Sequence, residues 1–316
     1  HIFTKNQLRL IRISVIIVNY KAKYFLKNCI ASVLSSDIME KVEIIVVDNN
    51  SSDGSNEMLQ KEFPEVKLLQ NSENLGFSKA NNKGASVAKG DYLLILNPDT
   101  VLDETTLSEM LDFSENQTQF GAAGVHFIDG SGKFLPESKR NFPNLKVAGA
   151  KLLGYSKYYY ANHIQKDANA EIDILTGAFM FIKSKVYKEV GGFDEDFFMY
   201  GEDIDLSYRI TKAGYKNHFV GTCKVVHFKG ESTVKDKFYL RNFYGALSIF
   251  YKKHFPNNAA LYVLIDSMIN TIISVKSLSV PRRAKAQTRL VNWVYISDND
   301  DFLSDLKKSE RSDLEF

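Results

Sequence analysis

The sequence predicts an α/β fold in which a mixed, mainly parallel sheet is flanked by helices. Three observations support this class. Short aliphatic runs alternate with segments of helical periodicity over the first hundred residues. Those runs are apolar throughout, as in strands that are buried on both faces between helices. The chain has 316 residues, 44% of them hydrophobic, which is enough for a large core.

Strands and helices are expected in strict alternation in the first part of the chain. In the first helix, several apolar residues recur on one face, and Pro64 and Gly90 follow the ends of the next two helices. The last strand ends before Pro98, which cannot donate a ladder hydrogen bond. The expected strands are 14–20, 42–48, 66–70 and 91–96, and the expected helices are 25–36, 55–63 and 78–89.

The pattern changes after residue 120. A "DGSG" turn between two apolar runs indicates antiparallel strands, and residues 136–170 form a long basic and aromatic stretch with little periodicity. Further on, 172–183 and 224–228 are expected strands, and 201–214 is a helix whose acidic first turn suits its dipole.

Three parts of the chain can be distinguished by these patterns. We expect an α/β domain over residues 1–234, with a Rossmann-like half at 13–120 and a second half at 121–234, followed by a helical extension at 235–316. The extension begins with a helix that carries both aromatic and basic residues. We favour a core-packing helix with a solvated face; a basic surface resting on anionic membrane is the alternative.

Charge and cysteine usage narrow the function classes. The 40 basic and 38 acidic residues nearly balance, which argues against a nucleic-acid binder. Cys29 and Cys223 lie in apolar contexts without CxxC spacing, as buried thiols of a reducing, cytoplasmic compartment do. The N-terminal segment lacks the apolar core of a signal peptide, and no apolar run reaches the length of a transmembrane helix.

Three polar segments follow expected strands and should share one edge of the sheet. They are "NYK", "DNNSSDGS" and "NPD", and ligands of such sheets bind outside the carboxyl ends of the strands. Asp48 and Asp53 could also be turn and helix-cap residues. There is no GxGxxG, and "GAKLLGYS" has Tyr155 where a P-loop requires Lys, so NAD-binding and P-loop classes are disfavoured.

A set of acidic residues and one histidine could supply chemistry at this edge. Asp99 and His227 with oxygen-rich neighbours would suit a divalent cation, Mn²⁺ or Mg²⁺, that neutralises a diphosphate leaving group. Glu202, Asp203 and Asp205 open a helix, and a separate carboxylate could act as a general base toward a hydroxyl. Each residue also has a structural alternative: Asp99 as a helix cap, Glu202 and Asp203 as favourable helix N-terminal charges, and His227 as a core histidine.

Six segments occur in a characteristic order across residues 13–233. They are "SVIIVNYKAKYFLKNCIASV", "VEIIVVDNNSSDGS", "NLGFSKANNKG", "GDYLLILNPDTVL", "LTGAFMFIKSKVYKEVGGFDEDFFMYGEDIDLSYRI" and "VVHFKGES". With them the chain resembles family 2 glycosyltransferases of the GT-A fold, in the branch that includes bacterial rhamnosyltransferases.

The resemblance implies a nucleotide-sugar site in the first half. Asp48 would recognise the base of the donor, with Val18 and Tyr20 framing it. Gly76 would allow a close backbone approach to the nucleotide. Asn97 takes the place of the first Asp of the DxD signature, which removes one carboxylate from the expected metal site.

The resemblance also implies the catalytic and metal residues. Asp203 matches the catalytic base, with Glu202 in a supporting role, and Asp99 matches the metal-binding acid. His227 matches a position that completes the metal or diphosphate contacts. Thr176 and Gly177 belong with the nucleotide-sugar residues, because they would line the groove for the donor sugar or the acceptor.

The implied reaction is an inverting transfer of a hexose from a thymidine or uridine diphosphate sugar, rhamnose among them. The acceptor would be a hydroxyl of a glycan or lipid-linked saccharide in bacterial surface polysaccharide synthesis, and the enzyme would be cytoplasmic or peripheral at the inner face of the cell membrane. Two alternatives stay open: a non-catalytic module that binds nucleotide sugars or glycans, and a sugar-nucleotide nucleotidyltransferase.

Overall fold

The computed structural model describes residues 11–142, 147, 158–228, 237–256, 263, 266–271 and 273–274. All of them fall within one unit of the chain, His1–Val280. The end of the expected helical extension, residues 275–316, lies outside the described residues.

The first half of the molecule is a parallel sheet, as predicted. Its strands are β1 (Ile13–Asn19), β2 (Val42–Asp48), β3 (Lys67–Gln70) and β4 (Tyr92–Leu96), arranged β3-β2-β1-β4. The connecting helices are α1 (Lys23–Leu34), α2 (Ser55–Glu62) and α3 (Gly76–Ser86). The sequence predicts all seven elements, the strands from their apolar residues and the ends of α2 and α3 from the Pro64 and Gly90 that follow.

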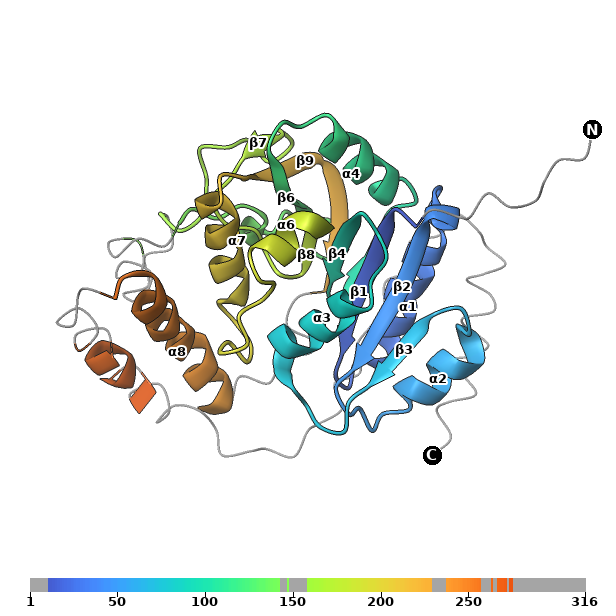
Figure 1. Cartoon of the computed structure of the whole chain (residues 1–316), viewed down its shortest axis with the longest axis horizontal. Helices are drawn as coiled ribbons and strands as arrows, with labels where there is room; N and C mark the ends of the chain where they lie inside the picture. The colour runs from blue at the N-terminus through green and yellow to red at the C-terminus, as the bar shows by residue number, and fades with distance from the viewer. Residues whose placement is uncertain are drawn as a thin grey trace, which may run out of the picture. The chain divides into compact units, whose positions relative to one another are not determined.

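The sheet continues through strands from the second half of the chain. Within the described residues the order is β3-β2-β1-β4-β8-β6-β9-β5, with β7 (Ala170–Glu171) pairing with β9 (Lys216–His227) off this path. The strand β8 (Phe179–Lys183) is antiparallel to β4. The strand β6 (Phe120–Ile128) is parallel to β9. The strand β5 (Thr100–Val101) is antiparallel to β9. This confirms a mixed α/β sheet with flanking helices (Figure 1).

The core lies on both faces of the sheet. On one face, alternate residues of β1 pack with α1, α2 and α4 (Thr106–Glu115). On the other face, Ile16 of β1 packs with α3, α6 (Ser184–Glu189) and α7 (Glu202–Lys212). Two short 3₁₀ turns, η1 (Met39–Lys41) and η2 (Pro136–Ser138), complete the connections. The double covering explains why the strands are apolar on both faces.

Three expected elements differ from the structure. Of the strand expected at 172–183, only Phe179–Lys183 forms one, as β8; the residues before it form a turn that contains Gly177, and β7 ends at Glu171. The second arm of the "DGSG" hairpin makes only an isolated bridge, Ile128 to Phe134, before Pro136 starts η2. The strand expected at 224–228 begins at Lys216, because β9 also pairs with β6 and β7.

The helix α8 (Lys237–His254) packs against the segment that leads into α7. Phe197 joins Phe250, Tyr251 and other residues of the extension in one buried cluster. Lys252 pairs with Asp266, and Lys253 pairs with acidic residues of the α/β domain. These contacts match the core-packing interpretation of this helix. Among the described residues, no helix is both long and apolar enough to span a bilayer.

Candidate active site

Asp48 is held at the carboxyl end of β2, beside the end of β1. Asn19, which is its register partner, donates from Nδ2 to Asp48 Oδ1 (2.8 Å), and the Ser51 N–H donates to Oδ2 (2.9 Å). Asn56 adds a longer bond to Oδ2 (3.3 Å). Since a carboxylate accepts about four hydrogen bonds, these three donors use most of its capacity. Asp48 is fully buried, so burial and three donors fix its orientation.

The two residues expected to frame this carboxylate lie on β1 and just beyond it. Val18 pairs with Val47 in the parallel ladder and packs in a small cluster with Ile45 and Ala80. Tyr20 follows the strand and is 44% exposed, so its ring is accessible at the edge of the sheet.

A chain of asparagines connects this edge to the start of α3. Asn71 donates to Asn49 Oδ1 (2.8 Å), and Asn49 donates to the Gly76 carbonyl (3.0 Å). Gly76 has φ +81°, and a Cβ there would lie 2.4 Å from the Phe198 carbonyl oxygen. In the structure, the segment that lies close to the Gly76 backbone is therefore part of this chain, namely the one that contains Phe198 and leads to α7.

Asp99 and His227 form a buried pair next to β4. The Asn97 N–H still bonds to the Ala178 carbonyl (2.9 Å), and after Pro98 the chain turns into β5, where Thr100 pairs with His227. His227 Nε2 lies 3.5 Å from Asp99 Oδ1. The adjacent Asp103, rather than Asp99, accepts the Thr105 N–H ahead of α4. The helix-cap alternative for Asp99 is therefore wrong.

The chemistry of this pair fits a divalent cation. Asp99 Oδ1 and His227 Nδ1 are buried without a hydrogen-bond partner among the described residues. Buried polar atoms are normally satisfied, so such atoms point to a missing ligand. The described residues contain no group of three or more His, Cys, Asp or Glu side chains that could hold a metal. Oxygens from the substrate or water would have to complete the coordination.

Glu202 and Asp203 open α7 after two left-handed residues, Tyr200 (φ 74°) and Gly201 (φ 81°). Asp203 Oδ2 accepts from Arg140 Nη2 (2.6 Å) and from the Gly177 N–H (3.1 Å). The acidic first turn is therefore more than a dipole effect, because Asp203 is anchored by residues from distant parts of the chain.

Glu202 has a different environment from its neighbour. It is 6% exposed, and Oε2 has no hydrogen-bond partner among the described residues. Burial, together with the negative charge of Asp203, raises the pKa of Glu202 to about 8. The two neighbouring carboxyls therefore differ, since burial favours the neutral form of Glu202 whereas Asp203 is ion-paired with Arg140.

Thr176 and Gly177 lie between β7 and β8, and only Gly177 touches the carboxylate pair. The Thr176 hydroxyl donates to the Glu137 carbonyl (2.5 Å), which fixes the loop. Gly177 contributes its N–H to Asp203. The Asn97–Ala178 bond joins this loop to the strand end that carries Asp99.

Arg140 belongs to the site and was missed in the sequence. It is 7% exposed, Nη2 contacts both Asp203 and the Leu175 carbonyl, and Nη1 donates to the Tyr159 hydroxyl (3.2 Å). Burial alone would lower the pKa of the guanidinium, but Asp203 and Tyr159 together raise it above its ordinary value. The one sequence signal is the basic-aromatic character of residues 136–170.

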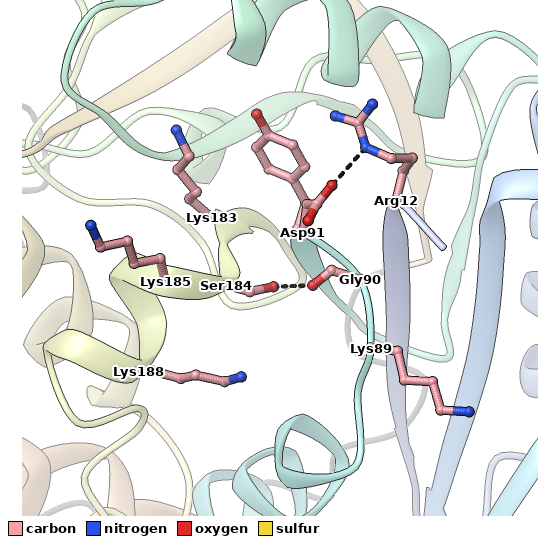
Figure 2. A pocket seen from close by; sticks show the side chains of 9 residues that line it. Arg12, Lys89, Gly90, Asp91, Lys183, Ser184, Lys185 and Lys188 are labelled. Carbon is pink, nitrogen blue, oxygen red and sulfur yellow. Dashed lines mark hydrogen bonds and ion pairs between the residues drawn. The ribbon is translucent and has the colours of Figure 1, made fainter. Parts of the chain in front are cut away.

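A second concave region lies away from these residues. A cavity of about 680 Å³ is lined by Arg12, Asp91 and three exposed lysines of β8 and α6, among others (Figure 2). Asp91 immediately precedes β4 and Tyr92 begins it, whereas Asp99 follows the other end of the strand. This basic cavity therefore lies at the opposite end of the strand from the candidate site.

Comparison with known proteins assigns this chain to a family. Residues 14–191 match the model of "Glycosyl transferase family 2", which is more than half of the chain. Asp48, Gly76, Asn97, Asp99 and Gly177 fall inside the matched residues.

Two curated relatives have names that specify a sugar. The chain is 29% identical over 243 residues, 70% of its length and 78% of the relative, to N-acetylglucosaminyl-diphospho-decaprenol L-rhamnosyltransferase of Mycobacterium tuberculosis (strain ATCC 25618 / H37Rv). It is 27% identical over 225 residues to rhamnosyltransferase WbbL of Escherichia coli (strain K12), covering 68% of this chain and 82% of WbbL.

Solved structures agree with the fold. GalNAc-T7, solved with UDP, GalNAc and Mn²⁺, aligns with a TM-score of 0.56 at 16% identity, covering 84% of this chain and 56% of that one. The mannosyltransferase PcManGT from Pyrobaculum calidifontis, in complex with GDP-Man and Mn²⁺, aligns with a TM-score of 0.55 at 16% identity, covering 85% of this chain and 76% of that one. With the sheet order, these neighbours establish the GT-A fold.

Proposed function

This chain belongs to glycosyl transferase family 2, and from that premise we propose that it is an inverting glycosyltransferase with Asp203 as its general base. The supporting observation is the Asp203 carboxylate itself. It is buried and ion-paired, and Oδ2 is occupied by two donors while Oδ1 accepts only the Ile204 N–H (2.8 Å) among the described residues. A carboxylate held in this way can accept a proton in one fixed direction.

The transfer is a single displacement. The acceptor hydroxyl gives its proton to Asp203 as its oxygen forms a bond to the anomeric carbon of the donor. The bond from that carbon to the diphosphate oxygen breaks, and the electron pair leaves with the nucleoside diphosphate. Attack from the face opposite the leaving group inverts the anomeric centre, and one base suffices for this step.

We assign the diphosphate to the neighbourhood of Asp99 and His227. Asp99 Oδ1 and His227 would hold a divalent cation, and Mn²⁺ or Mg²⁺ there would neutralise the charge of the leaving group. The unpartnered, buried Asp99 Oδ1, with His227 Nε2 3.5 Å away, supports this assignment. Asn97 supplies no charge, so the pair provides one carboxylate where a DxD motif would provide two.

The relatives suggest the substrates. Two of them are named as rhamnosyltransferases, and one name gives N-acetylglucosaminyl-diphospho-decaprenol as the acceptor. We therefore propose thymidine diphosphate-rhamnose as the first donor to test, a uridine diphosphate sugar as the second, and a lipid-linked saccharide as acceptor. The two free, buried thiols fit the reducing cytoplasm. Peripheral contact with the inner face of the membrane remains a prediction.

Donor binding can be measured before any acceptor is known. The intact protein is titrated with thymidine and uridine diphosphates and their sugars, with and without MnCl₂, and thermal unfolding is followed. A ligand at a hundred times its Kd stabilises the folded state by about 2.7 kcal/mol. We expect a thymidine or uridine compound to raise Tm, and more with manganese. No shift with any nucleotide would contradict the proposed site.

Catalysis is tested by Asp203→Asn, with Asp112→Asn, an exposed aspartate on α4, as the control. We expect the Asp203 variant to bind donor and lose transfer, and the control to behave as wild type. Near-normal turnover by Asp203→Asn would refute the assignment of the base. Donor binding without nucleoside diphosphate release by the wild-type protein on any acceptor would instead indicate a non-catalytic binding module.

A further inference from the structure

Arg140 is a buried cation that connects three segments around the proposed base. Its guanidinium contacts Asp203 at the start of α7, the Leu175 carbonyl before β8, and the Tyr159 hydroxyl. The backbone of Arg140 is itself fixed, because it bridges to Tyr160 on one side and to Ile174 on the other. The guanidinium is therefore held in place from its own main chain.

The two oxygens of Asp203 are not equivalent. Oδ2 accepts one hydrogen bond from Arg140 Nη2 (2.6 Å) and one from the Gly177 N–H (3.1 Å). A carboxylate oxygen offers two lone-pair directions, so Oδ2 is filled. Within the described part of the chain, Oδ1 accepts only the Ile204 N–H (2.8 Å) and keeps one direction open.

From this asymmetry we propose that Arg140 is the positioning residue of the general base: it fixes Oδ2 of Asp203 so that Oδ1 takes the proton of the acceptor hydroxyl. The inference rests on the proposed function and adds a residue to it. Arg140 holds the base without touching the reacting atoms.

The electrostatics of the neighbouring carboxyl give this role a measurable consequence. Burial and the charge of Asp203 raise the pKa of Glu202, and the Arg140 charge acts to lower it. Without that cation, two adjacent buried carboxyls share one site and hold a proton between them to higher pH. The pH at which Glu202 loses its proton would then rise, and the acid limb of the rate profile would move upward with it.

Tyr159 offers a milder perturbation of the same contact. It is 6% exposed and its hydroxyl accepts from Arg140 Nη1 (3.2 Å), so Tyr159→Phe removes one of the contacts that orient the guanidinium. Tyr158, its neighbour, is 64% exposed and provides a matched control through Tyr158→Phe. Both substitutions delete only a hydroxyl group.

The experiment measures nucleoside diphosphate release across a pH series for the intact wild-type protein, Arg140→Lys, Arg140→Met and Tyr159→Phe. The donor is thymidine diphosphate-rhamnose, or the donor with the largest thermal shift, and the acceptor is N-acetylglucosaminyl-diphospho-decaprenol, or water when it does not react. The controls are Tyr158→Phe and Arg12→Lys, the latter an ion-paired arginine at the other end of the sheet.

We expect Arg140→Met to lower kcat by about 10²-fold or more, the usual contribution of a positioned base, with little change in donor KM. Arg140→Lys should retain part of the rate, because an ammonium keeps the charge and loses the fixed fork geometry. Tyr159→Phe should show a smaller loss than Arg140→Lys, and the acid limb should rise in pH in the Arg140→Met variant.

The outcomes separate the two proposals. If the wild-type protein releases nucleoside diphosphate and the folded Arg140→Lys and Tyr159→Phe variants match it in kcat and pH profile, Arg140 is no positioning residue. Equal losses of donor binding, Tm and kcat with an unchanged pH profile would also overturn the inference, since that result describes a structural residue. If the wild-type protein releases nothing from any bound donor, the proposed function fails and the role of Arg140 fails with it.

Discussion

Gly76 is the point where the edge of the sheet that holds Asp48 meets the segment before α7, and Gly76→Ala tests that junction. Two costs are expected from the structure. The residue has φ +81°, and a Cβ would lie 2.4 Å from the Phe198 carbonyl oxygen and 2.8 Å from the Phe198 ring. The same carbonyl accepts the Phe77 N–H (2.7 Å), so it cannot move away without losing that bond.

The magnitudes can be separated with a second glycine. A left-handed backbone costs an L-residue about 1–2 kcal/mol, and overpacking in a packed region costs about 1–3 kcal/mol. Gly214 has φ +88°, and a Cβ added there would meet no described atom within 4 Å, so Gly214→Ala carries only the first cost. The difference between the variants, about 1–3 kcal/mol, corresponds to about 2–12 °C in Tm for a protein of this size.

The assay is thermal and urea unfolding of both variants, followed by titration with the best nucleotide. We expect Gly76→Ala to unfold at the lower temperature and to bind nucleotide more weakly, because the loop from Asn71 to Gly76 is hydrogen-bonded to the edge that holds Asp48. Gly214→Ala should bind as wild type. Equal stability of the two variants would refute the argument that the Phe198 contact is rigid.

Three further outcomes are expected. Because the pKa of Glu202 is raised, the folded state binds the Glu202 proton more tightly than the unfolded state does. The stability that this proton contributes is complete below about pH 4.5 and is lost as pH rises toward about 8. The loss amounts to at most about 1.4 kcal/mol per pH unit. Thermal unfolding between pH 5 and 8 should therefore show a fall in Tm that Glu202→Gln reduces; parallel curves would contradict it. Asp205 is fully buried and contacts His254 (2.7 Å) and Lys253 (3.0 Å) of α8, so Asp205→Asn should destabilise by about 3–5 kcal/mol in urea unfolding, and an unchanged midpoint would argue against the network. Asn97→Asp adds a carboxylate beside the proposed metal pair, so it should strengthen the manganese-dependent rise in Tm, and a weaker response would count against a metal there.

The strands of the first half could be predicted because the apolar residues within each strand indicate that it is buried. The run from Leu93 to Leu96 is apolar on both faces and meets Pro98, so both the strand and its end have a sequence signal. Asp48 follows the same logic at the end of β2. The rule that ligands bind at the carboxyl ends of parallel strands then locates the edge without any tertiary information.

Elements that depend on distant partners could not be predicted in this way. β5 has only two residues and exists through its pairing with β9, where Thr100 meets His227. The start of β9 is polar, and Asn217 is buried only because it donates to the Asp173 and Ser207 carbonyls. No local sequence pattern predicts such strands, because the hydrogen-bond partners of their buried polar residues come from distant parts of the chain.

The role proposed for Arg140 could not be predicted from the sequence for the same reason, because it depends on a distant partner. Its partner Asp203 lies 63 residues later, and neither residue's neighbours indicate that the two will meet in the core. A carboxylate in an acidic helix start is adequately explained by the helix dipole until the opposing cation is known.

The arrangement around α7 also changes how the helical extension should be understood. Asp203 faces Arg140 and Gly177 of the α/β domain, while Asp205, one residue beyond Ile204, faces Lys253 and His254 of α8. The first turn of the helix that carries the proposed base is thus held from two sides, by the domain and by the extension. A break between domain and extension at residue 235 would remove one of these supports. In the described residues, α8 therefore packs with the α/β domain and supports the start of α7.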